Sequence, residues 1–437
     1  MAAVHGNGIG GCTNAPWPHG SNGMDDEQVW PCSFLRGDAI LSREIGWGIL
    51  CGAGAILSFL TMSLMFLTIR YDRGKRYRLT ADNFTTANRL MGSGFTASVL
   101  VSQWTWVATL VQSSNMAWRY GIAGPFWYAA GAAVQMILFS VLAVQVKRKA
   151  PGAHTITEVV LARWGHSAHV VFVFFCLLTN ILVTTMLVRG GANVLSALTG
   201  ISRVGSAVVL PLVVTCHTVQ GGFRATYLAG VWHNLFMFVA TLLFCFRVFA
   251  SDSELGNPDK VYQRLSDLGS LYPVEGNRQG SFLTFWSQQG VLFGVVNLVG
   301  NFGTVFVDQG FWQTAFACKN PLAARRGFIL GGLAWFSIPF AMATAMGLGA
   351  RALNLPLSPE EADMGLVPAA VALHLFGTTG AVVFAIQVVT AVASSGSSQQ
   401  LAVASIITFD IYKRYINPEA TAGQVCATTS HHHHHQQ

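Results

Sequence analysis

A cluster of polar residues inside a long apolar run is the feature that most constrains this chain. The run extends over about residues 91–120, which is long enough to cross a bilayer. Its segment 102–115 nevertheless contains two Gln, two Trp, two Thr and an Asn. A polar group in hydrocarbon is costly unless it is paired or lines a wet cavity. We therefore expect a membrane helix that faces protein on several sides and helps to hold a polar solute.

The composition is typical of a membrane protein. Of the 437 residues, 52% are hydrophobic and only 10% are charged, against roughly 25% charged residues in soluble domains. The mean hydropathy is +0.46. The net charge of +7 does not indicate nucleic-acid binding, because the Lys and Arg residues lie in short loops between apolar runs.

Nine segments are apolar and long enough to span a bilayer. They lie near residues 45–70, 91–116, 123–146, 167–189, 204–220, 225–250, 282–317, 325–351 and 379–411. A short amphipathic segment, 366–375, precedes the last of them.

The loop charges predict an orientation. Basic residues follow the first, third, fifth, seventh and ninth segments, namely Arg73, Lys75, Arg76, Arg78, Arg89, Lys147, Arg148, Lys149, Arg224, Lys319, Arg325, Arg326, Lys413 and Arg414. Acidic residues collect in the loops 251–281 and 352–365. By the positive-inside rule, we expect an extracellular segment at 1–44, a membrane domain at 45–412 and a cytoplasmic low-complexity tail at 413–437. Cys12 and Cys32 then lie where a disulfide is permitted, and whether they pair stays open.

Four stretches carry a family pattern. Two are SQWTWVATLVQSSNMAWRYGIAGPFWY (102–128) and VNLVGNFGTVFVDQGFW (296–312), and two are KRKAPGAHTITEVVLARWG (147–165) and SSGSSQQLAVASIITFDIYKRYINP (394–418). Through all four, the chain resembles the sodium:solute symporter family. Through the first two, it resembles the high-affinity urea transporters of plants, fungi and algae within that family.

The resemblance implies an all-α, polytopic fold of two inverted repeats related to the leucine transporter, with the solute at mid-membrane between broken helices. Segment 45–70 is then an extra N-terminal helix, and residues 91–250 form the first repeat. Segment 282–317 is the broken first helix of the second repeat, which lacks two of its five helices and is incomplete. After Pro418 the chain turns polar and ends in five His and two Gln. An expression tag, a low-complexity tract and translated non-coding sequence remain open, and the last is favoured.

Urea is planar and neutral, with N–H donors and one carbonyl acceptor, so we expect amide, hydroxyl or carboxylate groups between aromatic walls. Thr105, Thr109 and Gln112 would share one helix face. The predicted solute-binding residues are Gln103, Trp104, Trp106, Thr109, Gln112, Trp127, Asn301 and Asp308.

Each of these residues has a structural alternative. Trp104 and Trp106 could be interfacial anchors. Asp308 could cap or anchor a helix that breaks at residues 300–303. Asn297 and Asn301 either act with Asp308 or satisfy freed backbone groups. Trp127 stands where the family's sugar carriers keep a glutamate, which disfavours a sugar.

The resemblance also implies a cation site. Its ligands would be Ala391, Ser394 and Ser395, with carbonyl oxygens of Ser102 and Thr105 where the first repeat helix unwinds. The run of Ser around Gly396 could instead be a small-residue packing face. The family motif at 155–165 contains Glu158 and Arg163, for which a structural ion pair is expected.

We therefore predict a symporter that moves urea across the plasma membrane, coupled to Na⁺ or H⁺. No catalytic residue, cofactor, nucleic-acid partner or metal beyond a possible Na⁺ is expected, so the chain is not an enzyme. The alternatives are a truncated, non-transporting fragment or a membrane-embedded regulator. A related small polar solute, such as a polyamine, also stays open.

Overall fold

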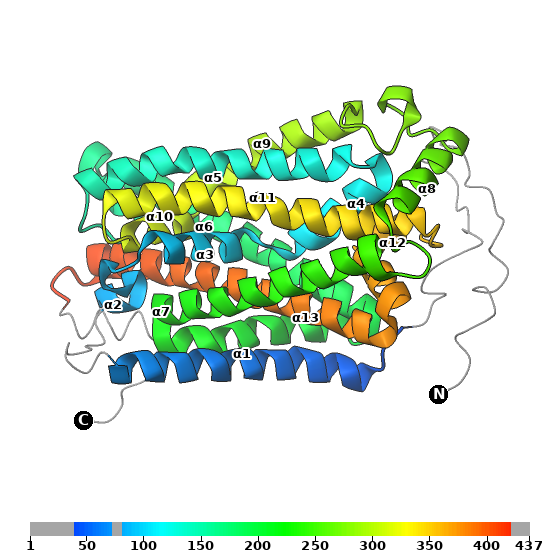
Figure 1. The fold of residues 1–437 in the computed structure, drawn as a ribbon. Coiled ribbons are helices and arrows are strands. Elements are labelled where there is room, and N and C mark those ends of the chain that lie inside the picture. The colour runs from blue at the N-terminus through cyan, green and yellow to red at the C-terminus, as the bar shows by residue number, and fades with distance from the viewer. Residues whose placement is uncertain (1–38, 72–80, 421–437) are drawn as a thin grey trace.

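The computed structural model describes residues 39–71 and 81–420, which form a bundle of helices joined by short loops (Figure 1). These residues contain two isolated β-bridges and no β-strand, so the predicted all-α class is confirmed. Residues 1–38, 72–80 and 421–437 lie outside the described residues. They include Cys12, Cys32, four of the basic residues after the first helix and most of the predicted tail.

In the first half of the chain, one long helix and two short elements precede a pair of short helices, and three long helices follow that pair. The elements are α1 (Arg43–Tyr71), α2 (Ala81–Thr86), η1 (Ala87–Arg89), α3 (Ser93–Trp104), α4 (Val107–Tyr120), α5 (Ala123–Lys149), α6 (Ile156–Thr199), α7 (Arg203–Phe246) and η2 (Arg247–Ser251).

In the second half of the chain, a broken helix is again followed by long helices. Its elements are α8 (Pro258–Leu271), η3 (Arg278–Gly280), α9 (Gln288–Val307), α10 (Gln309–Ala317), α11 (Pro321–Ala352), α12 (Pro359–Asp363), α13 (Val367–Ser405) and η4 (Ile406–Ile416).

Seven helices of the described residues are long and apolar enough to cross a membrane, which confirms a multi-pass chain. The two other predicted spans are 91–116 and 204–220. The first consists of the short helices α3 and α4, and the second lies in α7 before its bend at Gly222, whose φ is 56°. The predicted amphipathic segment forms the start of α13, which bends at Gly377.

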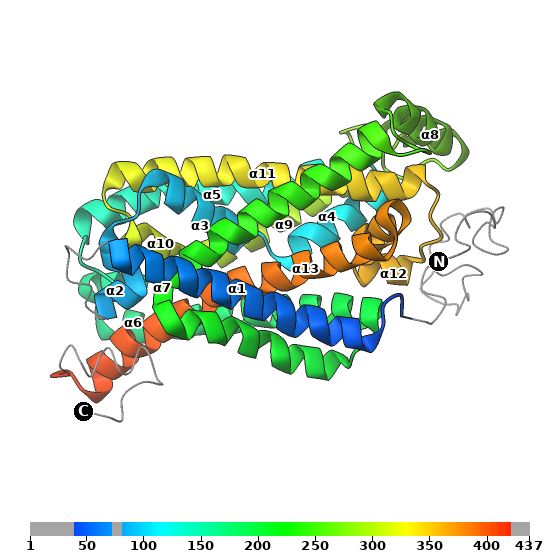
Figure 2. The same cartoon turned by 60° about the horizontal axis from the view of Figure 1, so that its bottom comes forward.

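The order of elements is that of the predicted inverted repeat. A broken helix, α3 with α4, is followed by α5, α6 and the two halves of α7. The broken helix α9 with α10 is followed by α11 and α13. The extra N-terminal helix α1 lies against α7 and α13 at the outside of the bundle (Figure 2). Helices α3, α4 and α5 pack against α11, so the first broken helix is enclosed by protein.

The first break falls at Thr105 and Trp106, where the polar segment predicted an unusual helix. Trp106 has extended backbone angles, with φ −80° and ψ 167°. The second break falls at Asp308, with φ −72° and ψ 115°.

The prediction of a second break at residues 300–303 was wrong, because α9 is helical through Gly300 and Gly303. Each glycine costs only about 1 kcal/mol in a helix interior. A membrane strongly favours keeping the backbone bonded internally. The helix ends instead where Asp308 can cap the next one: its carboxylate accepts a hydrogen bond of 2.7 Å from the N–H of Gly310.

Helix α6 begins eleven residues before the predicted span at 167, at Ile156. Thr155 is its N-cap, and Glu158 completes a capping box. The expected ion pair between Glu158 and Arg163 is replaced by other contacts. Glu158 lies 3.6 Å from the ring of His154, and the Arg163 guanidinium lies over the ring of Trp164.

Charged side chains gather at both ends of the bundle. Helix α2 lies at one end, and α8 and α12 lie at the other (Figure 1). At the α2 end, Lys147 donates to the carbonyl of Phe316 and Arg89 donates to that of Gly152. At the opposite end, Arg119 pairs with Asp363 at 2.7 Å, and His374 lies 3.5 Å from Glu254.

Candidate functional site

A cavity of about 180 Å³ lies next to the first helix break. Its walls come from both broken helices and from α5, α6 and α11. The aromatic lining residues are Trp104, Trp106, Tyr128, Phe293 and Trp335, the polar ones are Thr109, Gln112, Asn297 and Asn301, and the remainder are Ala108, Ala132 and Met186.

The hydroxyl of Thr109 holds the first break together. It accepts a hydrogen bond of 3.1 Å from the N–H of Trp106 and donates one of 3.2 Å to the carbonyl of Trp104. These backbone groups lose their helical partners at the break, so Thr109 satisfies them locally. The hydroxyl therefore lies at the point where a broken helix and the cavity meet.

The two tryptophans of the break use their indole N–H groups within the protein. Trp104 donates to the carbonyl of Ala132 at 2.9 Å, and Trp106 donates to the carbonyl of Gln103 at 2.8 Å. Their ring centroids lie 5.2 Å apart at an interplanar angle of 64°. Trp104 is only 3% exposed, which is not the position of an interfacial anchor. Both rings are thus held as rigid walls of the cavity.

The facing wall is built by α9 and α5. Asn297 donates to the carbonyl of Tyr128 at 3.0 Å, and Asn301 donates to the side-chain oxygen of Asn297 at 2.7 Å. The ring of Tyr128 stacks on that of Phe293 at 5.9 Å. The amides of Asn297 and Asn301, one helical turn apart, therefore form a polar strip on an apolar helix.

Trp335 contributes a group without a partner. Its indole N–H is buried and has no hydrogen-bond partner among the described residues. Its ring centroid lies 6.1 Å from that of Trp104.

Sequence reasoning missed Trp335, Tyr128 and Phe293 as cavity residues, since an aromatic residue in an apolar helix carries no distinguishing pattern. Asn297 was singled out from the sequence beside Asn301 and Asp308, and it lines the cavity together with Asn301.

Three of the predicted solute-binding residues do not line this cavity. Gln103 accepts a hydrogen bond of 3.2 Å from the hydroxyl of Thr314. Trp127 donates to the carbonyl of Phe285 at 3.1 Å. Asp308 lies at the other break, so the expected single compact site of Asp308 with Trp104, Trp106 and Thr109 is divided between two places.

Asp308 is fully buried among neutral partners. One carboxylate oxygen accepts hydrogen bonds from the N–H of Gly310 and from the amide of Asn180, at 2.7 and 3.3 Å. The other accepts from the amide of Gln399 at 2.7 Å. Asn180 also donates to the side-chain oxygen of Gln399. The acid therefore caps α10 and joins it to α6 and α13.

The residues of the expected cation site come together where α13 crosses the first break. The hydroxyl of Ser395 donates to the carbonyls of Ser102 and Thr105, at 3.2 and 3.3 Å. The hydroxyl of Ser394 is buried and has no partner among the described residues. Ala391 lies one turn earlier on α13 and is fully buried. Hard monovalent cations prefer oxygen ligands of this kind.

A charged cluster lies at the α2 end of the bundle. Asp82 pairs with Arg89 at 2.8 Å and with His154 at 3.1 Å. The hydrogen bond from His154 holds the pKa of Asp82 below its usual value. Burial lowers the pKa of His154, but hydrogen bonds to Asp82 and Glu158 outweigh it, so the net direction is upward. Gln309, next to the second break, donates to the backbone carbonyl of His154 at 3.0 Å.

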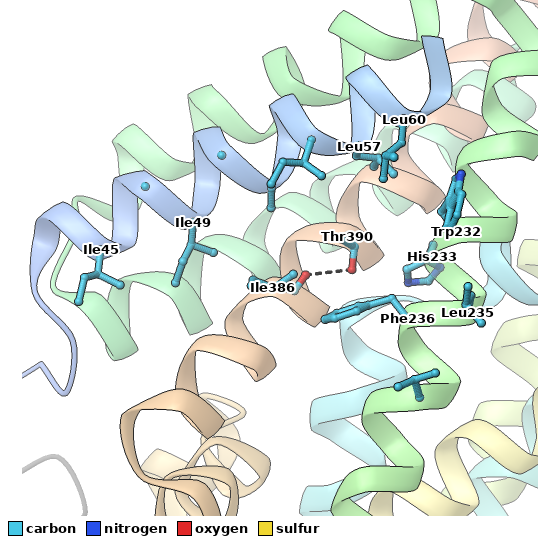
Figure 3. Close-up of a pocket in the computed structure, with 15 residues that line it drawn as sticks. Ile45, Ile49, Leu57, Leu60, Trp232, His233, Leu235, Phe236, Ile386 and Thr390 are labelled. Atoms are coloured by element: carbon cyan, nitrogen blue, oxygen red, sulfur yellow. Dashed lines mark hydrogen bonds between the residues drawn. The ribbon is translucent and has the colours of Figure 1, made fainter. Parts of the chain in front are cut away.

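A larger cavity of about 740 Å³ opens between α1, α7 and α13. Its lining is largely aliphatic, with His233 of α7 and Thr390 of α13 facing each other across it (Figure 3). None of the residues of either helix break lines it. An apolar lining suits lipid rather than a small polar solute, so this cavity is not the candidate solute site.

Comparison with known proteins shows the family to which the chain belongs. The model of the sodium:solute symporter family matches residues 84–430. The urea-proton symporter DUR3 of Oryza sativa subsp. japonica is 46% identical over 408 residues, which cover 90% of this chain and 56% of that protein. The probable urea active transporter 1 of Schizosaccharomyces pombe is 43% identical over 397 residues, covering 89% of this chain and 59% of that protein.

The urea active transporter of Saccharomyces cerevisiae is 38% identical, covering 89% of this chain and 54% of that protein. The chain thus spans little more than half the length of these relatives. Among solved structures, a Na⁺-coupled sialic acid symporter in its substrate-bound outward-open state superposes with a TM-score of 0.68. The two chains are 16% identical, and the superposition covers 88% of this chain and 78% of the sialic acid symporter, which shows a shared fold.

Proposed function

This chain belongs to the sodium:solute symporter family, and on that premise we propose that it serves secondary active transport of urea, coupled to a monovalent cation. No chemical bond changes in such a process, so no residue has a catalytic role. The membrane would be the plasma membrane. The end of the bundle with α2, Arg89 and Lys147 would face the cytoplasm, because basic residues are retained there.

The observation that carries the proposal is the cavity beside the first break. Its volume of about 180 Å³ has room for several water molecules, and therefore for a one-carbon diamide. Trp104 and Trp106 form flat walls, and Asn297 and Asn301 bring amide groups. Buried acceptors left unpaired would penalise ligands without N–H groups.

The same lining favours urea over a polyamine. A polyamine carries several positive charges, and a buried cation needs a carboxylate or a comparable partner. None of the residues that line the cavity is acidic, and Asp308 lies outside it. A neutral solute that both donates and accepts hydrogen bonds matches the lining better.

The proposed cation site adjoins the solute cavity at the first break, since Thr105 lies between the cavity-lining residues Trp104 and Trp106. The oxygens of Ser102, Thr105, Ala391, Ser394 and Ser395 would surround a monovalent cation. The hydroxyl of Ser394 has no hydrogen-bond partner among the described residues. The support is the contact of Ser395 with both carbonyls of the break. An ion there would fix α13 against the broken helix that lines the cavity, which couples ion and solute binding.

The test is uptake of radiolabelled urea by cells that lack their own urea transporter and express this chain. We expect uptake above that of cells with an empty vector, inhibited by methylurea and thiourea and not by glucose. Uptake equal to the vector control would favour a non-transporting fragment or regulator. Competition by glucose as strong as that by methylurea would refute the assignment of the cavity.

A further inference from the structure

Asp308 is an acid without a charged partner in the middle of the bundle. Its side chain is fully buried, and its hydrogen bonds come from Gly310, Asn180 and Gln399. None of the ion pairs formed by the described residues includes it. A carboxylate in such a place is costly when it is neither paired nor able to take up a proton.

The two amides around Asp308 can serve either form of the acid. A side-chain amide carries both a donor and an acceptor, and it exchanges them by turning through half a rotation. Asn180 donates to Asp308, while the oxygen of the same amide is buried and has no partner among the described residues. A protonated carboxyl would donate its O–H to that oxygen once the amide has turned. With the acid ionised, the oxygen of Asn180 stays unpaired, so a proton on Asp308 supplies the donor that this cluster lacks. The turn of the amide exchanges its hydrogen bond to Gln399 for the one from the carboxyl group.

The groups that face Asp308 leave it as the titrating residue of this cluster. On α6, Cys176 lies one turn before Asn180 and is buried. On α10 and α13, the nearest side chains are the neutral Gln309, Ser398 and Gln399. The next acid, Asp410 of η4, is held by His169 at 3.0 Å and has a partner of its own. No cationic side chain is among the contacts of Asp308 in the described residues.

The position of Asp308 links it to both breaks. Gln399, which donates to it, lies one turn after Ser395, which contacts the first break. Asp308 also caps α10, and the negative charge at that helix start is favourable. Neutralising the acid weakens the cap and the bond to α13 together. Protonation of Asp308 would therefore affect the solute cavity through α13.

We propose that Asp308, held between Asn180 and Gln399, is a proton-binding site that is loaded and emptied during transport. The carboxylate takes one proton from water to become a carboxyl, and it returns that proton to water; no other bond forms or breaks. This site is distinct from the serine site on α13. The inference rests on the proposed urea transport for its role, although proton binding itself does not depend on urea.

A first experiment measures protonation directly. Infrared difference spectra of the purified chain in lipid vesicles, recorded across a pH titration, report the carbonyl stretch of a protonated carboxyl. We expect a titrating band that is lost in Asp308→Asn and kept in the control Asp410→Asn. Asparagine is also a good N-cap, so the helix start is preserved in the variant. A band that persists in Asp308→Asn would overturn the assignment.

A second experiment separates protonation from a structural role. Urea exchange between equal concentrations needs no net proton movement, whereas accumulation driven by a pH gradient does. We expect Asp308→Asn to retain exchange and to lose accumulation, falling to the level reached without a gradient. Loss of both, or retention of both, contradicts the proposal. If the wild-type chain takes up no urea, the proposed function fails, and the infrared titration still decides the proton site.

Discussion

Gln399 of α13 donates a hydrogen bond of 2.7 Å to the carboxylate of Asp308 at the second helix break. One turn earlier on the same helix, Ser395 donates to the carbonyls of Ser102 and Thr105 at the first break. Residues four apart on a helix share a face, so a single side of α13 holds both breaks. A movement of α13 therefore changes both places at once, which suits a transporter whose ion and solute sites must communicate.

Thr109→Ala should weaken urea binding. The hydroxyl satisfies the N–H of Trp106 and the carbonyl of Trp104, and leaving buried groups unpaired costs about 1–3 kcal/mol. We expect the half-saturating urea concentration to rise about tenfold, measured by initial uptake rates. Thr185→Ala is a matched control, because that exposed Thr bonds only within α6. Equal behaviour of the two variants would remove Thr109 from the site.

Ser395→Ala should weaken cation dependence more than protein abundance. The variant loses both contacts with the first break and one candidate ligand. A hydrogen bond to a charged group contributes about 1.5–3 kcal/mol, so the half-saturating cation concentration should rise about tenfold or more. Na⁺ and pH are varied separately in the uptake assay. Ser337→Ala, on an exposed face of α11, is the control. An unchanged cation dependence would leave the serines as a packing face.

The spans were predictable from sequence because hydropathy alone sets them. The family resemblance implied the first break near Ser102 and Thr105, whereas the polar cluster by itself predicted only a helix that does not face lipid on all sides. The spacing argument there was wrong in one respect: Thr105 lies in the break and donates to the carbonyl of Val101, so helical periodicity begins only at Val107. Thr109 and Gln112 still share the cavity face.

The second break and the early start of α6 were missed for a common reason. Both depend on side chains that replace backbone partners, namely Asp308 at Gly310 and Thr155 at Glu158. Hydropathy does not register such caps, and glycine content points elsewhere. The contribution of Trp335 to the cavity depends on how α11 packs across α3, α4 and α5, which no local pattern encodes.

Gly303→Ala tests the corrected position of the second break. Gly303 lies inside α9, and a Cβ built there meets nothing within 4 Å. Alanine favours helix over glycine by about 1 kcal/mol, so folding and urea uptake should be unchanged or slightly improved. In contrast, a Cβ at Gly131 would lie 2.5 Å from the carbonyl oxygen of Gly294, and Gly131→Ala should lower abundance. Loss of uptake in a well-folded Gly303→Ala protein would favour the break at residues 300–303 that was predicted from the sequence.

The cluster at the α2 end should make stability depend on pH. The pKa of His154 is raised above 6.5, so its contribution is complete below pH 6.5 and is lost as pH rises through the raised value. The pKa of Asp82 is lowered below 3.8, so its contribution is present above 3.8 and is lost as pH falls through the lowered value. The pair contributes most between these limits.

His154→Gln should therefore lower the melting temperature most between pH 3.8 and 6.5, with a smaller difference at higher pH. Thermal unfolding of the purified chain, followed over that range, measures the effect. His166→Gln is a control, since His166 is exposed. A difference from wild type that is the same at every pH would mean that His154 acts by packing on Phe409, its stacked neighbour, rather than by charge.

Trp335→Phe tests whether the indole N–H of Trp335 donates a hydrogen bond to the solute or whether the ring serves only as an apolar wall. The indole N–H of Trp335 is buried and has no partner in the part of the chain that the structure describes, and the ring lines the cavity beside Trp104. A carbonyl oxygen bound there would receive a hydrogen bond, whose loss costs about 1 kcal/mol when both groups are neutral. We expect a weaker affinity for urea, by about fivefold. Thiourea, whose sulfur is a poorer acceptor than oxygen, should lose less affinity than urea.

Trp164→Phe, at a ring that is 60% exposed on α6, controls for loss of a tryptophan in general. If urea and thiourea affinities both stay unchanged in Trp335→Phe, the indole N–H does not contact the solute, and the carbonyl of urea must be bound by the amides of α4 or α9 instead.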